Sequence, residues 1–98
     1  MPITVTKTEL NDVILIKPSI FEDHRGMYVE TFNEDDYKQN NINIKFVRDD
    51  VSTSSKNVLR GLHYDNKTWK LIHCMYGKIY FVVADMRKDS DQYLKWQS

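Results

Sequence analysis

The sequence contains few of the residues that crosslink, break or loosen a chain: its 98 residues include one cysteine, two prolines and three glycines. The single cysteine, Cys74, excludes a disulfide within the chain. Its place in the apolar run 71–75 favours an inert core thiol in a reducing compartment. No apolar run approaches the roughly 20 residues of a membrane span, and no basic region precedes an apolar one at the N-terminus. We therefore expect a cytoplasmic protein with no membrane partner.

The chain carries no formal net charge, because 14 basic residues balance 14 acidic ones. A chain without a basic excess has no electrostatic surface for nucleic acid or for an anionic membrane, so local charges have to bind any phosphate group. No repeat, low-complexity segment or linker divides the sequence. We expect residues 1–98 to form a single domain, whose hydrophobic content of 41%, with six tyrosines and four phenylalanines, supports a modest β-core.

Alternating patterns and short apolar runs predict an all-β fold with one short helix. Asn33 is a helix N-cap followed by acidic residues, which predicts a helix that ends at Asn40 and Asn41. Gly77 is placed to take a positive φ in a tight turn. Strands are predicted at residues 3–9, 13–16, 27–32, 46–47, 58–64, 69–76 and 78–86, with a further strand starting at 93–96. Such short strands are typical of a sandwich or a jelly-roll barrel.

The strand predicted to start at 93–96 has no predicted strand after it that could pair with its free edge. A jelly roll needs about eight strands, and the sequence provides about seven. Tyr93, Leu94 and Trp96 then leave an apolar strand edge uncovered, and such edges recruit other chains. Either a second chain covers this edge, or the sequence is a C-terminally incomplete fragment.

The run 58–64, Val-Leu-Arg-Gly-Leu-His-Tyr, carries Arg60 and His63 into what looks like a buried strand. A buried guanidinium or imidazole costs several kcal/mol unless it has a partner. One interpretation makes Arg60 an edge residue with a solvated head and His63 a hydrogen-bonded core histidine. The other places both beside a wet cavity in which a ligand supplies the partners. Strict alternation puts the two on opposite faces, and a bulge at Gly61 would realign them.

Together with four upstream blocks, this run resembles the signature of the dTDP-4-dehydrorhamnose 3,5-epimerase family of nucleotide-sugar epimerases. The blocks lie in the family's order and nearly its spacing, at residues 21–26, 28–33, 46–50 and 52–55. The resemblance covers nearly the whole sequence but only the N-terminal portion of the family's longer domain. It implies a partial cupin-like jelly-roll barrel that epimerises a nucleotide-diphosphate 4-keto-sugar at the carbons flanking the ketone. The family context is surface polysaccharide and deoxysugar biosynthesis.

The resemblance also implies a homodimer formed by exchange of N-terminal strands, with no cofactor and no metal. Arg48 and Asp50 stand where the family usually has glutamine and asparagine, and the loop 65–69 is shorter than in the rhamnose-pathway enzymes. These departures resemble the divergent branch that acts on other nucleotide-linked keto-sugars, including heptoses. The family's proton-donating tyrosine and histidine-paired aspartate lie outside the matching portion. The alternative is a non-catalytic remnant that binds sugar nucleotides or only dimerises.

Epimerisation next to a ketone needs a base near the working pH and a positive charge beside the developing enolate. His63 is the candidate base, because histidine ordinarily titrates near neutrality. Lys70, in the family's Lys-Leu dipeptide, is the candidate that stabilises the enolate, although it could also be an ordinary solvated lysine. Asp85 ends an apolar run, and it either holds Lys70 or His63 in place or pairs with Arg87 or Lys88.

The substrate-binding candidates are charged residues at positions where the family's binding residues lie. The planar fork of an arginine binds two oxygens of a diphosphate at once. Each arginine alone could be an ordinary surface residue, but together they favour a pyrophosphate site. The candidates are Arg25, Glu30, Arg48, Asp50 and Arg60.

Overall fold

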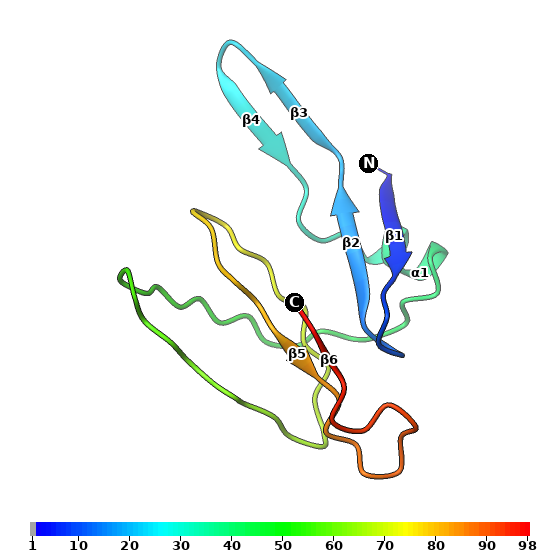
Figure 1. Cartoon of the computed structure of the whole chain (residues 1–98). Helices are drawn as coiled ribbons and strands as arrows, with labels where there is room; N and C mark the ends of the chain where they lie inside the picture. The colour runs from blue at the N-terminus through cyan, green and yellow to red at the C-terminus, as the bar shows by residue number, and fades with distance from the viewer. Residues whose placement is uncertain (1) are drawn as a thin grey trace.

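The computed structural model describes residues 2–98, which form three antiparallel two-stranded sheets and one short helix. The all-β class with a single short helix is confirmed. Within residues 2–98 the three strand pairs do not join into one continuous sheet or barrel. In chain order the elements are β1 (Ile3–Lys7), β2 (Ile14–Pro18), β3 (Ile20–Asp23), β4 (Gly26–Val29), α1 (Glu34–Gln39), β5 (Val83–Ala84) and β6 (Trp96–Gln97) (Figure 1).

The N-terminal hairpin forms where the alternating pattern predicts it. β1 and β2 pair from Ile3 opposite Pro18 to Lys7 opposite Ile14. Pro18 ends its strand, where the missing N–H costs little. In the connecting turn, the Thr8 hydroxyl donates to the carbonyl of Val13 at 2.6 Å, which closes the turn from within.

The second hairpin, β3 with β4, contains a strand that the sequence pattern did not indicate. We predicted a strand at 27–32, but the observed strand begins at Gly26 and ends at Val29, and β3 pairs with it. The Asp23 carboxylate accepts hydrogen bonds from the backbone N–H of Arg25 at 2.8 Å and from its Nε at 3.0 Å. Gly26 then takes a φ of +126°, which glycine adopts without strain. The two hairpins follow one another as an extended arm (Figure 1).

The helix is confirmed at its predicted place. Asn33 accepts a hydrogen bond from the backbone N–H of Asp36 at 3.0 Å, and Asn41, just past the helix, takes a left-handed φ of +64°. Tyr37 is buried, and its ring lies edge-on to Phe32 at 4.7 Å between centroids. Phe32 in turn contacts Phe46 at 5.7 Å. This aromatic cluster fixes the helix against the segment that follows it.

The strands predicted at 46–47, 58–64 and 69–76, and most of the one at 78–86, are wrong for the described structure. Residues 43–82 run as long loops (green to yellow in Figure 1), and only Val83–Ala84 of the predicted stretch joins a ladder. A strand is stable only when a neighbour receives its backbone hydrogen bonds, and residues 2–98 supply these segments with none. Gly77 does take the predicted positive φ, at +84°, between two unpaired segments.

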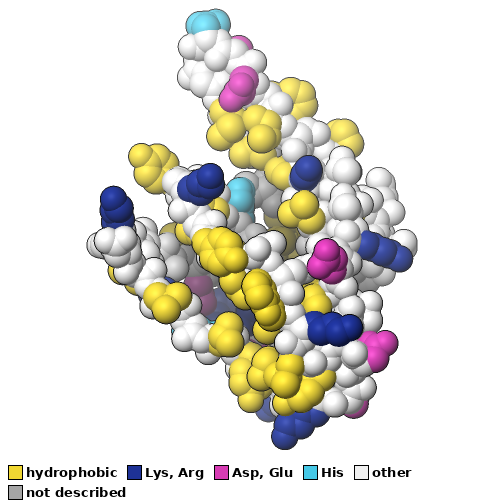
Figure 2. All heavy atoms as spheres, in the orientation of Figure 1, with side chains coloured by type: hydrophobic (Ala, Val, Ile, Leu, Met, Phe, Trp, Pro, Cys, Tyr) yellow, Lys and Arg dark blue, Asp and Glu magenta, His cyan; other side chains and the backbone are white. Residues whose placement is uncertain are grey.

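Apolar side chains are therefore largely exposed rather than gathered in the expected β-core. Among the described residues, the buried apolar side chains are Leu10, Tyr37 and Ile42. Leu59 and Tyr76 are 96% and 98% exposed, and Figure 2 shows apolar side chains over much of the visible face. Cys74, expected in a core, is exposed. The lack of neighbouring strands explains both the absence of the expected β-core and the exposure of Cys74.

At the C-terminal end, β5 and β6 close a loop that returns the chain toward the first hairpin. Val83 lies opposite Gln97 and Ala84 opposite Trp96. The predicted strand at 93–96 thus begins later, at Trp96. The ladder is extended by Leu94 N–H donating to the Asp85 carbonyl at 2.7 Å.

The helix cap supports the following prediction. Asn33→Ala removes the acceptor of the Asp36 N–H and is expected to lower the free energy of unfolding by about 1 kcal/mol. Urea unfolding followed by the tyrosine signal measures it. Gln39→Ala changes an exposed side chain of the same helix and serves as the control. Equal stability of the two variants would contradict the assigned cap.

Candidate functional site

Arg60 is held by residues of the block 52–55, which the sequence associates with the family but not with Arg60. Its Nε donates to the Ser54 hydroxyl at 2.9 Å, and its Nη2 donates to the Thr53 carbonyl at 2.9 Å. The guanidinium thus ties the 52–55 block to the 58–64 run. The hydroxyl-rich composition of 52–55 was the signal in the sequence that could have identified this partner.

The interpretation of 58–64 as a buried strand is wrong in the described structure. Arg60 and His63 are both exposed, as are the apolar residues between and before them. Gly61 takes a φ of +121° between them, in a loop rather than in a sheet bulge. Neither Arg60 nor His63 needs a ligand to offset burial here, so the burial argument does not support the site.

Lys70 lies beside a carboxylate that its own loop fixes in place. Its Nζ is 4.0 Å from Asp65 Oδ2, and the lysine side chain is half-exposed. The backbone N–H groups of Lys67 and Thr68 donate to Asp65 Oδ1 at 2.9 and 2.8 Å. These bonds, with the Lys67 N–H contributing most, lower the pKa of Asp65. The short loop after His63 therefore carries a fixed negative charge toward Lys70.

The other arginine candidates pair with neighbouring carboxylates. Arg25 is bound to Asp23, whose pKa is lowered chiefly by the Arg25 side-chain hydrogen bond. Arg48 Nη2 lies 3.2 Å from Asp50 Oδ2, so two predicted binding residues form an exposed ion pair with each other. The β3–β4 turn lies at the far end of the arm from residues 48–60 (Figure 1). Glu30 lies just after β4 and is half-buried. The structure does not gather these five candidates into one site.

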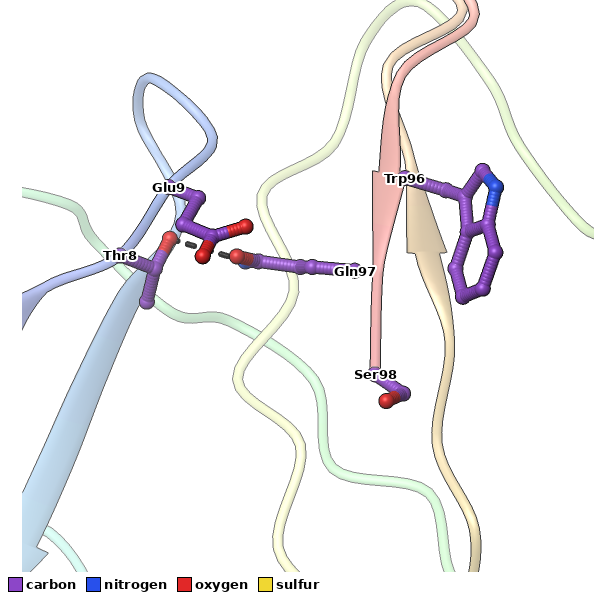
Figure 3. Close-up of a pocket in the computed structure, with 5 residues that line it drawn as sticks. All are labelled: Thr8, Glu9, Trp96, Gln97 and Ser98. Carbon is purple, nitrogen blue, oxygen red and sulfur yellow. Dashed lines mark hydrogen bonds between the residues drawn. The ribbon is translucent and has the colours of Figure 1, made fainter.

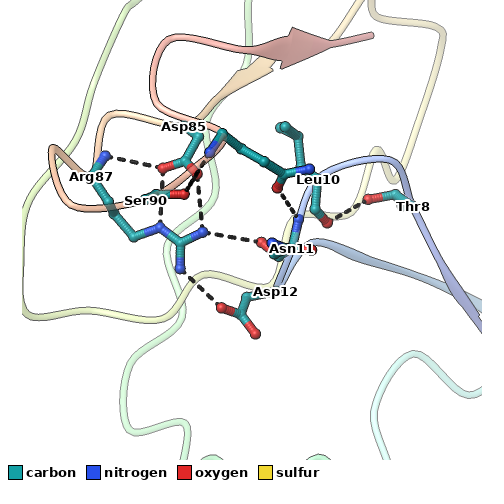
Figure 4. A network of polar contacts seen from close by, with 8 residues as sticks. Thr8, Leu10, Asn11, Asp12, Asp85, Arg87 and Ser90 are labelled. Carbon is teal, nitrogen blue, oxygen red and sulfur yellow. Dashed lines mark hydrogen bonds and ion pairs between the residues drawn. The ribbon is translucent and has the colours of Figure 1, made fainter.

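Asp85 adopts one of its two alternatives, pairing with Arg87. Its side chain is 3% exposed, and its oxygens accept from Arg87 Nε at 3.0 Å, Arg87 Nη2 at 3.1 Å and the Ser90 hydroxyl at 2.6 Å (Figure 4). The Arg87 guanidinium and then the Ser90 hydroxyl hold the pKa of the Asp85 carboxyl well below its ordinary value of 3.8. The Asp-x-Arg spacing in the sequence predicts this pair, but not its other contacts.

Two hollows lie between the segment that follows β1 and the C-terminal residues 92–98. One, of about 480 Å³, is lined by Thr8, Glu9, Trp96, Gln97 and Ser98. Figure 3 shows the Gln97 amide directed at Thr8 across it, and Trp96 turned to the opposite side of β6. The second, of about 510 Å³, lies beside it and is lined in part by Gln92, Leu94 and Lys95. Neither is lined by His63, Lys70 or the candidate arginines.

Residues 2–98 contain neither a cluster of metal-ligating side chains nor a membrane-spanning helix. No group of three or more His, Cys, Asp or Glu side chains is placed to hold a metal ion there. No helix in that range has both the length and the apolar composition needed to cross a bilayer.

Comparison with known families identifies the chain's relatives. The family model described as dTDP-4-dehydrorhamnose 3,5-epimerase matches residues 7–98, which include every candidate residue. The chain belongs to the dTDP-4-dehydrorhamnose 3,5-epimerase family. The resemblance found in the sequence blocks is thereby confirmed, and the all-β structure with one short helix agrees with it.

Several curated epimerases are similar over nearly the whole chain. The dTDP-4-dehydrorhamnose 3,5-epimerase of Methanothermobacter thermautotrophicus is 41% identical over 92 residues, covering 92% of this chain and 50% of the relative. The Shigella flexneri enzyme of the same name is 40% identical over 96 residues, covering 94% and 53%. That of Neisseria gonorrhoeae is 43% identical over 94 residues, covering 94% and 29%. The chain thus spans about half or less of each epimerase. No solved structure matches it.

The Asp85 pair supports a prediction about pH. Asp85→Asn is expected to destabilise the chain at about pH 7, because an amide accepts more weakly from a guanidinium than a carboxylate does. The folded pKa of Asp85 is depressed, so its stabilisation is fully present above its ordinary pKa of 3.8 and is lost as the pH falls through the lower folded value. Urea unfolding should show that the difference in free energy of unfolding between the parent and the variant is smaller at about pH 2 than at about pH 7. A difference in free energy of unfolding that stays constant with pH would contradict this prediction.

Proposed function

We propose that this chain carries the N-terminal part of an epimerisation site for a dTDP-linked or related nucleotide-diphosphate 4-keto-sugar. The observation that carries the proposal is the family match over residues 7–98, which includes His63 and Lys70. Family membership also supports a role in the cytoplasmic synthesis of deoxysugars for surface polysaccharide such as lipopolysaccharide. The complete barrel of the proposed enzyme is cupin-like.

His63 is proposed to remove the proton from a carbon flanking the ketone. Loss of this proton places negative charge on the ketone oxygen, and the charge of Lys70 stabilises the resulting enolate. A proton returned to the opposite face completes the epimerisation. Asp65 keeps a carboxylate 4.0 Å from the Lys70 ammonium. Asp85, whose oxygens accept from Arg87 and Ser90, is given a structural role.

The arginines are proposed to bind the diphosphate by exchanging partners. Arg25 and Arg48 are paired with exposed aspartates, and such pairs contribute little net free energy in water. A diphosphate offers several charged oxygens to the same planar fork and therefore competes with Asp23 and Asp50. Arg60 is held by neutral groups, so it can bind an anion without displacing a carboxylate.

The exposed position of His63 and Lys70 sets a condition on activity. Enolate stabilisation is strong in a site from which water is excluded, and both side chains here face solvent. We propose that residues 43–82 become strands of the catalytic barrel when they gain neighbours, from a second copy or from further polypeptide. The large apolar side chains at 58–64 and 69–76 are exposed in the described structure, and neighbouring strands would cover them, which supports this.

Deuterium exchange tests the catalytic assignment. In heavy water, the chain is expected to incorporate deuterium at the carbons flanking the ketone of a dTDP-linked 4-keto-sugar when a second copy supplies the strand neighbours. His63→Ala should lower the rate by about 100-fold or more, because the base is lost. His73→Ala, at another exposed histidine, is the matched control and should exchange at the parent rate. Unchanged exchange in His63→Ala would remove His63 from the mechanism.

A second candidate function is binding of the sugar nucleotide, or dimerisation, without turnover. It is favoured by one observation: His63, Lys70 and the candidate arginines are exposed, and none of them lines either hollow. Calorimetry with the same sugar nucleotide distinguishes the two functions. Binding that Arg60→Ala weakens, with no deuterium incorporation by the parent chain, would favour this second function.

We also propose that the chain forms a homodimer through its N-terminal strands. β1 and β2 pair only with each other within residues 2–98, and the exposed Ile14 and Leu15 lie on this hairpin. Open strand edges with apolar side chains recruit another chain. Light scattering at micromolar concentration is expected to show twice the chain mass of 11.7 kDa. Deleting residues 1–8 should yield monomers; a parent monomer unaffected by the deletion would refute the assembly.

A further inference from the structure

Arg87 connects two parts of the chain that are 75 residues apart in sequence. Its Nε and Nη2 donate to the buried Asp85, while its Nη1 donates to Asp12 Oδ2 at 2.9 Å and its Nη2 also approaches the Asn11 carbonyl at 3.4 Å. Asp12 and Asn11 lie in the turn of the β1–β2 hairpin. One guanidinium therefore joins this turn to the loop 86–95 between β5 and β6 (Figure 4).

Gln92 makes a second connection between the same two parts. Its Nε2 donates to the Glu9 carbonyl at 2.8 Å, and its Oε1 accepts from the Asn11 backbone N–H at 2.6 Å. Both ends of the amide are thus bonded to backbone groups of the turn. Next to it, Gln97 Nε2 donates to the Thr8 hydroxyl at 2.8 Å.

The buried carboxylate of Asp85 holds both connecting residues in place. Asp85 accepts from Arg87 through both oxygens, and Ser90 Oγ donates to the same carboxylate at 2.6 Å. Ser90 Oγ also accepts from the Gln92 N–H at 3.1 Å. Asp85 therefore orients Arg87 directly and Gln92 through Ser90. Contacts within their own loop thus orient the side chains of Arg87 and Gln92 toward the hairpin turn.

We propose that Arg87 and Gln92 form a latch that holds the β1–β2 hairpin against the loop 86–95 of the same chain. Leu10 is the one apolar residue of the described turn and loop that is buried, so polar bonds carry much of this attachment. The outer pair, Arg87 with Asp12, is about half-exposed on both sides and is screened by salt, whereas the inner pair with buried Asp85 is screened much less. Raising the ionic strength loosens the hairpin before it disturbs the loop.

Hydrogen exchange of the backbone amides, in low and in high salt, tests the latch. Arg87→Lys keeps the charge but loses the fork that reaches Asp85, Asp12 and Asn11 together. It is expected to raise exchange in β1 and β2 by roughly tenfold, with β3, β4 and α1 unchanged. Asp12→Asn should produce a smaller rise and abolish the salt dependence. Lys38→Ala, which breaks the exposed pair with Glu34 on α1, is the matched control and should leave β1 and β2 unchanged.

Three outcomes would overturn the latch. The first is unchanged exchange of β1 and β2 in Arg87→Lys. The second is a uniform rise over the whole chain, which would make Arg87 a residue of general stability. The third is a salt dependence that survives in Asp12→Asn, since the outer pair would then not be its source. None of these readouts depends on catalysis or on sugar-nucleotide binding.

Discussion

Every backbone N–H and C=O of a strand needs a partner, and this requirement governs the structure of the chain. Where a neighbour is available a few residues away, as in β1–β2 and β3–β4, the chain forms hairpins. Where the neighbour has to come from elsewhere, residues 43–82 stay extended and solvated. The exposure of apolar side chains follows from the same requirement, because unpaired segments cannot build a face on which others pack.

The elements that the sequence predicted correctly are those decided by local chemistry. The cap at Asn33 acts within three residues, and β1 finds its partner β2 across a short turn. β3 was missed because its polar end, with Asp23 and Arg25, looked like a binding block rather than a turn. The strands expected at 58–64 and 69–76 depend on distant neighbours, which no local pattern can supply.

The candidate residues show the same division. The pairing of Asp85 with Arg87 could be predicted because the two residues are two positions apart. The contact of Arg87 with Asp12 joins residues 75 positions apart, and no local sequence pattern indicates it. The family resemblance singled out His63 and Lys70 along the sequence but could not place them in space. Their positions relative to each other depend on sheet register, which is set only when the strands are paired.

Cys74 lies near the middle of the long unpaired region, and its thiol is exposed, with Sγ 3.5 Å from the Tyr76 carbonyl. Because the chain has one cysteine, this position accepts a fluorophore or spin label without any engineering of the sequence. A label there is four residues from Lys70 and reports directly on the segment for which we propose strand neighbours. Pairing of this segment with another strand can thus be followed spectroscopically in the native polypeptide.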